Sequence, residues 1–342
     1  MMVSANSMEA GAAQPHGGDL AAASALFPQA PRPWIDLSTG INPWPYPLPD
    51  IPASAWARLP EPAQERALCA AAATAYGVAD PALLVAAPGS QILIQTLPFL
   101  RAPGHVQVLA PTYGEHAPAW ARAGHRVEQV AGLPSPDGPL PDVLLLVNPN
   151  NPDGRIVPPA SLLALADALA ARGGWLVVDE AFCDLMQELS LAPGIGRPGL
   201  LVLRSFGKFY GLAGLRLGFL LGPESLVAAM ADRLGPWRVA GPALLVASQA
   251  LADIDWQTAT RARLASAHQS LKTALTEAGI EPVGGTALFQ LVRSPDGVDL
   301  FTALAQAGFW TRRFPDRPGL IRLGHPPDAH SFGRLCQILR SY

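Results

Sequence analysis

Lysine is almost absent from this chain of 342 residues. Of its 24 basic residues, only Lys208 and Lys272 are lysines, and arginine takes every other position. A guanidinium stays protonated, whereas a partly desolvated amine can lose its proton and bond to an aldehyde. A lysine at the end of a strand can also simply extend its charge into solvent. The residues around Lys208 indicate whether it forms such a bond or only extends its charge into solvent.

Charged residues are scarce as well, at 15%, and the formal net charge is -3 without any basic run. We therefore expect neither nucleic acid nor an anionic membrane surface as a partner. No apolar stretch has the length that spans a bilayer. Residues 1–13 lack the basic start and the continuous apolar segment of a signal peptide, and we expect them to form a disordered tail.

Patterns that bind metal are missing too. The seven histidines are scattered without the spacing of metal ligands, so metal hydrolase chemistry finds no support. The three cysteines are isolated, which suits a reducing cytoplasm and gives no zinc spacing; they are Cys69, Cys183 and Cys336.

What the chain does have is apolar material, at 49%, enough for a large core and for one large and one small domain. Strand and helix patterns alternate, which predicts an α/β fold with a mostly parallel central sheet, helices on both faces and a small α+β domain. We expect an N-terminal arm at 14–52, a large domain at 53–235 and a small domain at 236–342. The clearest patterns are helices at 62–76, 160–171 and 255–279 and strands at 143–147 and 175–178. Arginines and Lys272 on the last helix are expected to form a solvated face.

The surroundings of Lys208 favour chemistry. Ser205 precedes it by three residues, and Arg216 follows within Gly214-Leu-Arg-Leu-Gly218. Hydroxyl and guanidinium groups bind phosphate. This segment resembles the lysine segment of fold-type I pyridoxal-phosphate (PLP) enzymes, Ser-x-x-Lys followed by Gly-x-Arg-x-Gly. The resemblance implies that Lys208 forms a Schiff base with PLP and that Ser205 and Arg216 hold the cofactor phosphate.

Other segments fit the same family. A short strand turns into a helix at Gly89-Ser90, where backbone amides favour a phosphate. By resemblance this is the first phosphate loop of the family, with Gly89, Ser90 and Gln91 as contacts. Tyr113, after the strand at 106–110, stands where an aromatic residue stacks on the pyridine ring.

Two polar residues complete the predicted cofactor site. Asn151 lies in Asn148-Pro-Asn-Asn-Pro-Asp-Gly154, which resembles the Asn-Pro-x-Gly signature whose asparagine donates to the cofactor 3-oxygen. Asp179 ends an apolar strand and, by resemblance, pairs with the protonated pyridine nitrogen. The family thus assigns catalytic roles to Lys208, Asp179, Tyr113 and Asn151.

Some features point elsewhere or depart from the family. The strand ending in Asp179-Glu180 is also typical of the magnesium-binding strand of P-loop ATPases, but no phosphate loop with Gly-Lys-Ser/Thr occurs. Residues 194–199 fit Gly-x-Gly-x-x-Gly, yet they precede a strand rather than follow one. Phe182 and Leu59 stand where many members carry tyrosine, and Asp153 stands where threonine is frequent.

The N-terminal arm narrows the family. His16-Gly-Gly, followed by Asp-x-Ser-x-x-Ile-Asn42-Pro, is similar to the arm of the L-threonine O-3-phosphate decarboxylases of cobalamin biosynthesis, where His16, Gly17 and Asn42 would contact substrate. Arg322, on a short apolar strand, matches the family's arginine for the substrate carboxylate, against the alternative of a structural ion pair. Arg312 or Arg313 could supply the cation for a substrate phosphate.

The resemblance implies decarboxylation of L-threonine O-3-phosphate to (R)-1-amino-2-propanol phosphate, with Lys208 as the proton donor or acceptor. The alternative is an aminotransferase of the histidinol-phosphate type, because the sequence does not reveal which bond at the α-carbon lies perpendicular to the ring. A protein of this fold that only binds or assembles is a third possibility, which the retained lysine argues against. The resemblance also implies a homodimer, since fold-type I sites lie at a subunit interface.

Overall fold

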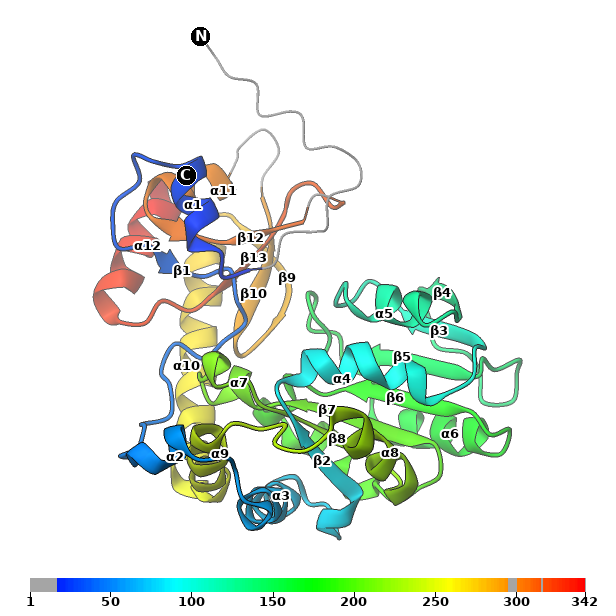
Figure 1. Ribbon diagram of the computed structural model, residues 1–342. Helices are drawn as coiled ribbons and strands as arrows, with labels where there is room; N and C mark the ends of the chain where they lie inside the picture. The colour runs from blue at the N-terminus through cyan, green and yellow to red at the C-terminus, as the bar shows by residue number, and fades with distance from the viewer. Residues whose placement is uncertain (1–16, 295–299, 315, 342) are drawn as a thin grey trace.

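The computed structural model of the chain describes residues 17–294, 300–314 and 316–341. Two bodies of secondary structure face each other, a large one around a seven-stranded sheet and a small one around a four-stranded sheet (Figure 1). The long helix α10, Ile254–Glu277, runs from one body to the other. His16, one of the residues predicted to bind substrate, lies outside the described residues.

The large sheet is mostly parallel. Its order is β2-β8-β7-β6-β5-β3-β4, and only β8 runs antiparallel to its neighbours. The strands are β2 (Leu84–Ala87), β3 (His105–Leu109), β4 (Arg126–Val130), β5 (Val143–Val147), β6 (Trp175–Asp179), β7 (Leu200–Ser205) and β8 (Gly218–Leu221). Every residue of β5 and β6 is buried, which explains their unbroken apolar sequences.

The reversed strand β8 was not predicted, and its direction follows from the short path before it. Residues 206–217 hold only the one-turn helix α7, Phe206–Phe209, and a 3-10 turn at Ala213–Leu215. A parallel connection has to cross back over the full length of the sheet, usually as a helix. The chain instead turns at the end of β7 and returns beside it. Lys208 lies in this turn.

Helices cover both faces of the large sheet, as predicted. One apolar cluster packs α3, α6 and α9 on one face, and a second packs α4, α5 and α8 on the other. The predicted helices at 62–76 and 160–171 are confirmed as α3 and α6, and α3 ends at Gly77 in the left-handed conformation. The helices of the large body are α2 (Ala53–Ala57), α3 (Pro62–Tyr76), α4 (Ser90–Thr96), α5 (His116–Arg122), α6 (Pro159–Ala170), α8 (Glu224–Leu234) and α9 (Gly241–Ala252).

The small body combines both ends of the chain. Its antiparallel sheet has the order β12-β13-β10-β9, and β1 pairs in parallel with β11. Helices α1, α11 and α12 lie around these strands (Figure 1). The elements are α1 (Leu20–Leu26), β1 (Ile35–Asp36), β9 (Glu281–Thr286), β10 (Phe289–Arg293), α11 (Leu300–Gln306), β11 (Phe309–Trp310), β12 (Arg312–Arg313), β13 (Leu320–Gly324) and α12 (Ala329–Ser341).

The prediction that the arginines of α10 are solvated is wrong for Arg261, whereas Arg263 is exposed and also contacts the arm. Arg261 donates from Nε to the carbonyl oxygen of Asp184 at 2.7 Å and lies over the ring of Phe209. The guanidinium of Arg263 stacks on Trp44, 3.7 Å from the ring centroid. These contacts attach α10 to both the arm and the large body. No helix within the described part of the chain is both long and apolar enough to cross a membrane.

Candidate active site

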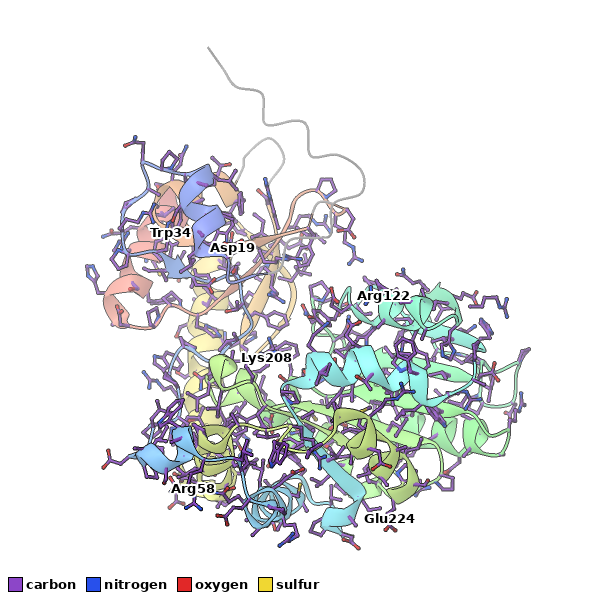
Figure 2. All side chains as sticks on the ribbon, in the orientation of Figure 1. Asp19, Trp34, Arg58, Arg122, Lys208 and Glu224 are labelled. Carbon is purple, nitrogen blue, oxygen red and sulfur yellow. The ribbon has the colours of Figure 1, made fainter. Side chains whose placement is uncertain are left out.

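Lys208 occupies α7, at the carboxyl end of β7 and on the side of the large sheet that faces the small body (Figure 2). Its pKa is lowered from 10.5 to about 8, first because burial disfavours the ammonium and then because Arg322 and Arg216 repel it, while Asp179 acts in the opposite direction. These four residues therefore lie close enough to feel one another, although they are spread over 144 positions of sequence from Asp179 to Arg322. A sizeable fraction of the Lys208 amine is neutral near physiological pH.

Asp179 is fixed by a partner that the sequence reasoning missed. Its Oδ2 lies 2.9 Å from Nε2 of His116 on α5, and its Oδ1 accepts from the backbone N–H of Ala181 at 3.1 Å. Asp179 and His116 are both buried. The only sequence signal for His116 was its place three residues after Tyr113. With one face held by His116, the carboxylate is oriented for a further cationic or N–H partner.

A cradle lined by glycine and arginine lies beside Lys208. Gly89 begins α4 with φ 90°, and a Cβ built on it would lie 2.8 Å from Nη2 of Arg216. A Cβ on Gly218 would come within 2.5 Å of the Ser90 backbone nitrogen. Because neither glycine has a Cβ, the Arg216 guanidinium and the Ser90 backbone amide can lie close to the same point. A guanidinium and a backbone N–H in this arrangement suit a phosphate group. Ser205, at the end of β7, is buried and lies directly opposite Gly218 in the pairing of β7 with β8.

Tyr113 and Gln91 are joined to each other. The Tyr113 hydroxyl donates to Oε1 of Gln91 at 3.1 Å, and Nε2 of Gln91 donates to Glu115 at 3.0 Å. Burial, together with the charges of Glu115 and Asp179, raises the pKa of Tyr113 to about 12, so the phenol stays protonated. The Gln91 side chain is therefore occupied in orienting Tyr113, and its predicted contact with the phosphate stays a prediction.

Arg322 and Asn151 come together from opposite ends of the chain. Nη1 of Arg322 donates to Oδ1 of Asn151 at 2.7 Å, and Nη2 donates to the carbonyl oxygen of Ser38 at 2.6 Å. Nε of Arg322 is buried with no hydrogen-bond partner among the described residues. Burial and the nearby charge of Arg312 lower the pKa of Arg322 to about 10. A buried guanidinium with spare donor capacity favours an anionic ligand.

The structure distinguishes Arg312 from Arg313. In the pairing of β12 with β13, Arg312 lies directly opposite Arg322, so the two side chains share one face of the small sheet. Arg313 points to the other face, where its guanidinium lies 4.5 Å from the ring centroid of Phe301. Arg312 is also half-buried and lies close to Tyr113, whereas Arg313 is exposed. Only the first of the two predicted arginines therefore faces the site.

The N-terminal arm reaches the site through Ser38. Its carbonyl oxygen accepts from Arg322, its hydroxyl accepts from the Gly18 backbone N–H at 2.7 Å, and a Cβ on Gly17 would lie 2.5 Å from the same carbonyl oxygen. Asn42 makes its contacts within the chain. It is buried, donates to the Phe209 carbonyl oxygen at 2.9 Å and accepts from the Trp44 backbone N–H at 2.9 Å.

These contacts give Asn42 a role in holding the turn that carries Lys208, since its backbone N–H also donates to the Lys208 carbonyl oxygen at 2.9 Å. The predicted contact between its side chain and substrate stays a prediction. Phe182 packs edge-on against Phe289, with ring centroids 5.3 Å apart, and brings no hydroxyl to the site. Among the described residues there is no group of three acidic, histidine or cysteine side chains that could hold a metal ion.

Comparison with known proteins agrees with this geometry. The family profile described as aminotransferase class I and II matches residues 53–336. A threonine-phosphate decarboxylase of Pseudomonas aeruginosa is 50% identical over 328 residues, covering 96% of this chain and 97% of that protein. Another from Sinorhizobium sp is 44% identical over 329 residues, covering 95% and 97%. A histidinol-phosphate aminotransferase of Aeromonas salmonicida is 32% identical over 266 residues, covering 72% and 74%.

Solved structures share the fold. The histidinol-phosphate aminotransferase of Sinorhizobium meliloti, in complex with pyridoxal 5'-phosphate, superposes with a TM-score of 0.76 at 22% identity and covers 96% of each chain. The L-threonine-O-3-phosphate decarboxylase of Porphyromonas gingivalis gives 0.73 at 20% identity, covering 89% of this chain and 98% of that one. Both likenesses concern the fold alone.

Proposed function

Because the chain belongs to the aminotransferase class I and II family, we propose that it decarboxylates L-threonine O-3-phosphate to (R)-1-amino-2-propanol phosphate, a step in cobalamin biosynthesis. The observation that carries this proposal is the identity of 50% and 44%, over nearly the whole chain, to proteins named threonine-phosphate decarboxylase. The histidinol-phosphate aminotransferase from Aeromonas salmonicida is more distant and matches a smaller share of the chain.

The enzyme depends on PLP, and the residues present suit this cofactor. When bound, PLP supplies an aldehyde that captures amines and a cationic ring that withdraws electrons from the carbon losing carbon dioxide. Arg216, Ser205 and the backbone at Gly89-Ser90 would hold its phosphate. Asp179 would pair with its ring nitrogen, Tyr113 would pack on the ring and Asn151 would donate to the 3-oxygen.

Lys208 would handle the proton. Because its pKa lies at about 8, the amine can accept a proton and give it up again near neutral pH. We assign it the delivery of a proton to the α-carbon after carbon dioxide has left. His116 supports this chemistry indirectly, since its contact with Asp179 fixes the carboxylate that balances the charge of the ring.

Arg322 and Arg312 would bind the two anionic groups of the substrate, its carboxylate and its phosphate. Their direct pairing across β12 and β13 puts two guanidinium groups on one face, which suits a ligand with two anions. Arg322 also contacts Asn151, so the carboxylate site adjoins the cofactor site.

The distinction between Arg312 and Arg313 is directly testable. Replacing Arg312 by alanine should raise the KM for L-threonine phosphate about 10- to 100-fold, the equivalent of about 1.5 to 3 kcal/mol for a hydrogen bond to a charged group. Unphosphorylated threonine should be affected much less. Arg313→Ala is the matched control and should leave the KM for L-threonine phosphate and the KM for threonine close to wild type. Equal losses for the two substrates in Arg312→Ala would contradict the assignment of Arg312 to the phosphate.

The reaction itself is tested by incubating the PLP-loaded protein with L-threonine phosphate in the absence of a keto acid. Catalytic release of carbon dioxide together with (R)-1-amino-2-propanol phosphate would support the proposal. Conversion of the cofactor to its amine form by histidinol phosphate, with no carbon dioxide released, would instead identify an aminotransferase.

A homodimer in the cytoplasm belongs to the same proposal. The isolated cysteines support the reducing compartment. Leu59, where the family often carries a tyrosine that reaches the partner subunit, is 65% exposed and cannot donate a hydrogen bond. That residue would therefore contribute apolar surface to the dimer instead of a contact with the cofactor.

A further inference from the structure

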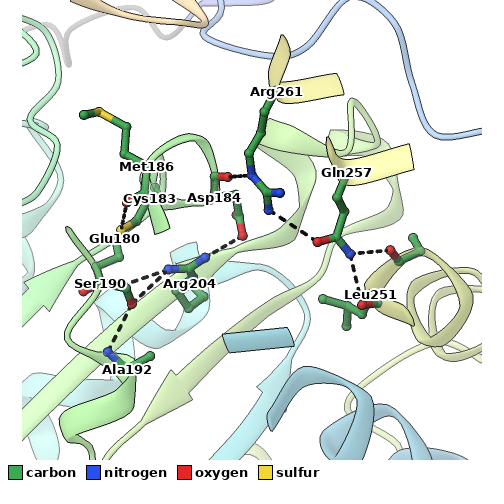
Figure 3. Close-up of polar contacts among 12 residues, drawn as sticks. Glu180, Cys183, Asp184, Met186, Ser190, Ala192, Arg204, Leu251, Gln257 and Arg261 are labelled. Carbon is green, nitrogen blue, oxygen red and sulfur yellow. Dashed lines mark hydrogen bonds and ion pairs between the residues drawn. The ribbon is translucent and has the colours of Figure 1, made fainter. Parts of the chain in front are cut away.

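A cluster of buried charges lies where the turn after β6 meets the end of β7 (Figure 3). At its centre is Arg204, whose side chain is 1% exposed. Nη1 donates to Oε2 of Glu180 at 2.9 Å, and Nη2 donates to Oδ1 of Asp184. The guanidinium also lies 4.3 Å from the ring centroid of Tyr76.

Glu180 has further partners. Its Oε2 accepts from the Ser190 hydroxyl at 2.6 Å, and its Oε1 accepts from the Leu191 backbone N–H at 2.7 Å. Burial raises the pKa of Glu180, although Arg204 and these donors act in the opposite direction. The carboxylate is therefore fully engaged.

The two halves of this cluster adjoin two residues assigned to the reaction. Glu180 directly follows Asp179, and Arg204 directly precedes Ser205 and stands four residues before Lys208. Successive residues of a strand point to opposite faces. Each pair of neighbours therefore places one side chain in the active site and the other in the buried cluster.

Stability alone does not account for this arrangement. Burying charges is expensive, and well-packed apolar side chains often give equal or greater stability than a buried ion pair. Arg204 instead offers a planar fork that serves two carboxylates at once, one at each end of the turn formed by residues 180–184. Arg261 of α10 holds the carbonyl oxygen of Asp184 from the other side.

We propose that Arg204 is a positioning residue that fixes the distance between Asp179 and Lys208 by holding the turn after β6 against the end of β7. The cluster touches neither substrate nor cofactor and acts through the strand ends. This inference rests on PLP being the cofactor and does not depend on which amino acid the enzyme decarboxylates.

The deciding variant is Arg204→Lys, which keeps the charge but replaces the two-armed fork by a single amine. Arg197→Lys is the matched control, since Arg197 pairs with Asp167 on the surface. Both proteins are titrated with PLP alone, and the pH at which the visible absorption of the bound cofactor changes is recorded. For Arg204→Lys we expect affinity for PLP to fall at least tenfold and the midpoint pH to move by at least half a unit. Arg197→Lys should match wild type.

Loss of thermal stability in Arg204→Lys with wild-type affinity and midpoint pH would overturn the proposal, because the cluster would then be only structural. If Arg204→Lys does not fold, the test uses Asp184→Ala. This variant removes one of the two carboxylates that Arg204 binds, while Arg261 still holds the backbone at residue 184. It should also move the midpoint pH by at least half a unit, and an unshifted midpoint would again overturn the proposal. Neither readout uses L-threonine phosphate, so failure of the proposed substrate would leave the result interpretable.

Discussion

Lys208 is surrounded by charges of both signs, and the positive ones prevail. Burial is the largest effect that opposes protonation of its amine, Arg322 and Arg216 add to it, and Asp179 favours protonation. Its pKa lies at about 8 in place of 10.5, so the neutral, reactive amine predominates above about pH 8. Substrate binding would neutralise Arg322, which links the basicity of the lysine to occupancy of the site.

This shift predicts the pH dependence of cofactor capture. In the protein freed of PLP, the rate at which Lys208 bonds to added PLP should rise with pH through a midpoint near 8 and then level off. Arg322→Met should move that midpoint upward, because the charge that lowers the pKa of Lys208 most is removed. Stopped-flow absorbance across a pH series measures both.

Lys272→Arg serves as the control, since Lys272 is exposed on α10 and should leave the rate profile unchanged. A wild-type midpoint near 10, or a midpoint that Arg322→Met does not raise, would contradict this account of Lys208.

At the scale of single residues, the sequence drew attention to residues whose type is chemically unusual for their setting. Lys208 stood out because lysine is rare, and Arg322 because it interrupts an apolar strand. His116 did not stand out, since its function arises only when α5 packs beside β6, 63 positions further on. Arg312 and Arg313 were indistinguishable for a similar reason. Which of the two faces the site depends on the register of β12 with β13.

At the scale of elements, the segment from the end of β7 to the start of β8 carries three parts of the site: Lys208, Arg216 and Gly218. Arg216 adopts the left-handed conformation, with φ 54°, which few non-glycine residues adopt. The strained turn directs its guanidinium toward Gly89. Two glycines flank Arg216, but their surroundings differ.

This difference gives a paired test. Gly218→Ala would bring a Cβ within 2.5 Å of the Ser90 backbone nitrogen, whereas a Cβ on Gly214 meets nothing within 4 Å. We therefore expect Gly218→Ala to weaken PLP binding at least tenfold, and Gly214→Ala to bind PLP as wild type does. Equilibrium titration of both variants with PLP measures the change. Equal affinity in the two would contradict the proposed phosphate cradle.

Elements with strong local signals were predicted well. The helix at 62–76 has a proline at its start and a glycine at its end, and both bounds are confirmed. The antiparallel direction of β8 could not be predicted, because direction depends on the path of the connection and not on the strand's own residues. The contacts of Arg261 and Arg263 were missed for the same reason, since the partners of a helix are set by neighbours distant in sequence.

At the scale of the whole molecule, large apolar side chains remain exposed near α2 and the start of α9. Trp56 is 69% exposed and Trp237 is 57% exposed. The two segments adjoin, because a Cβ on Gly241, at the start of α9, would lie 2.4 Å from the carbonyl oxygen of Ala55. Exposed apolar surface of this kind marks an interaction site, and we propose a second copy of the chain as its partner.

The dimer is tested by sedimentation equilibrium. The wild-type protein should sediment at about twice its chain mass of 35.9 kDa. Exchanging Trp56 and Trp237 together for glutamate should raise the dissociation constant at least about tenfold, since buried aromatic side chains contribute strongly to interfaces. Leu26→Glu, on α1 of the small body, is the control and should stay dimeric. A monomeric wild-type protein, or equal behaviour of the two variants, would contradict the assignment.

The pairing of β1 with β11 has a consequence for how the chain is made. Ile35 lies opposite Phe309, and Asn42 and Tyr46 attach by backbone hydrogen bonds to the turn at 208–210. During synthesis the seven strands of the large sheet are complete once residue 221 has left the ribosome. A further 88 residues have to be synthesised before β11, the pairing partner of β1, begins at Phe309. Contacts of such long sequence separation form late, because a large loop has to close first. The nascent chain can thus assemble the phosphate cradle before it acquires the pocket for substrate.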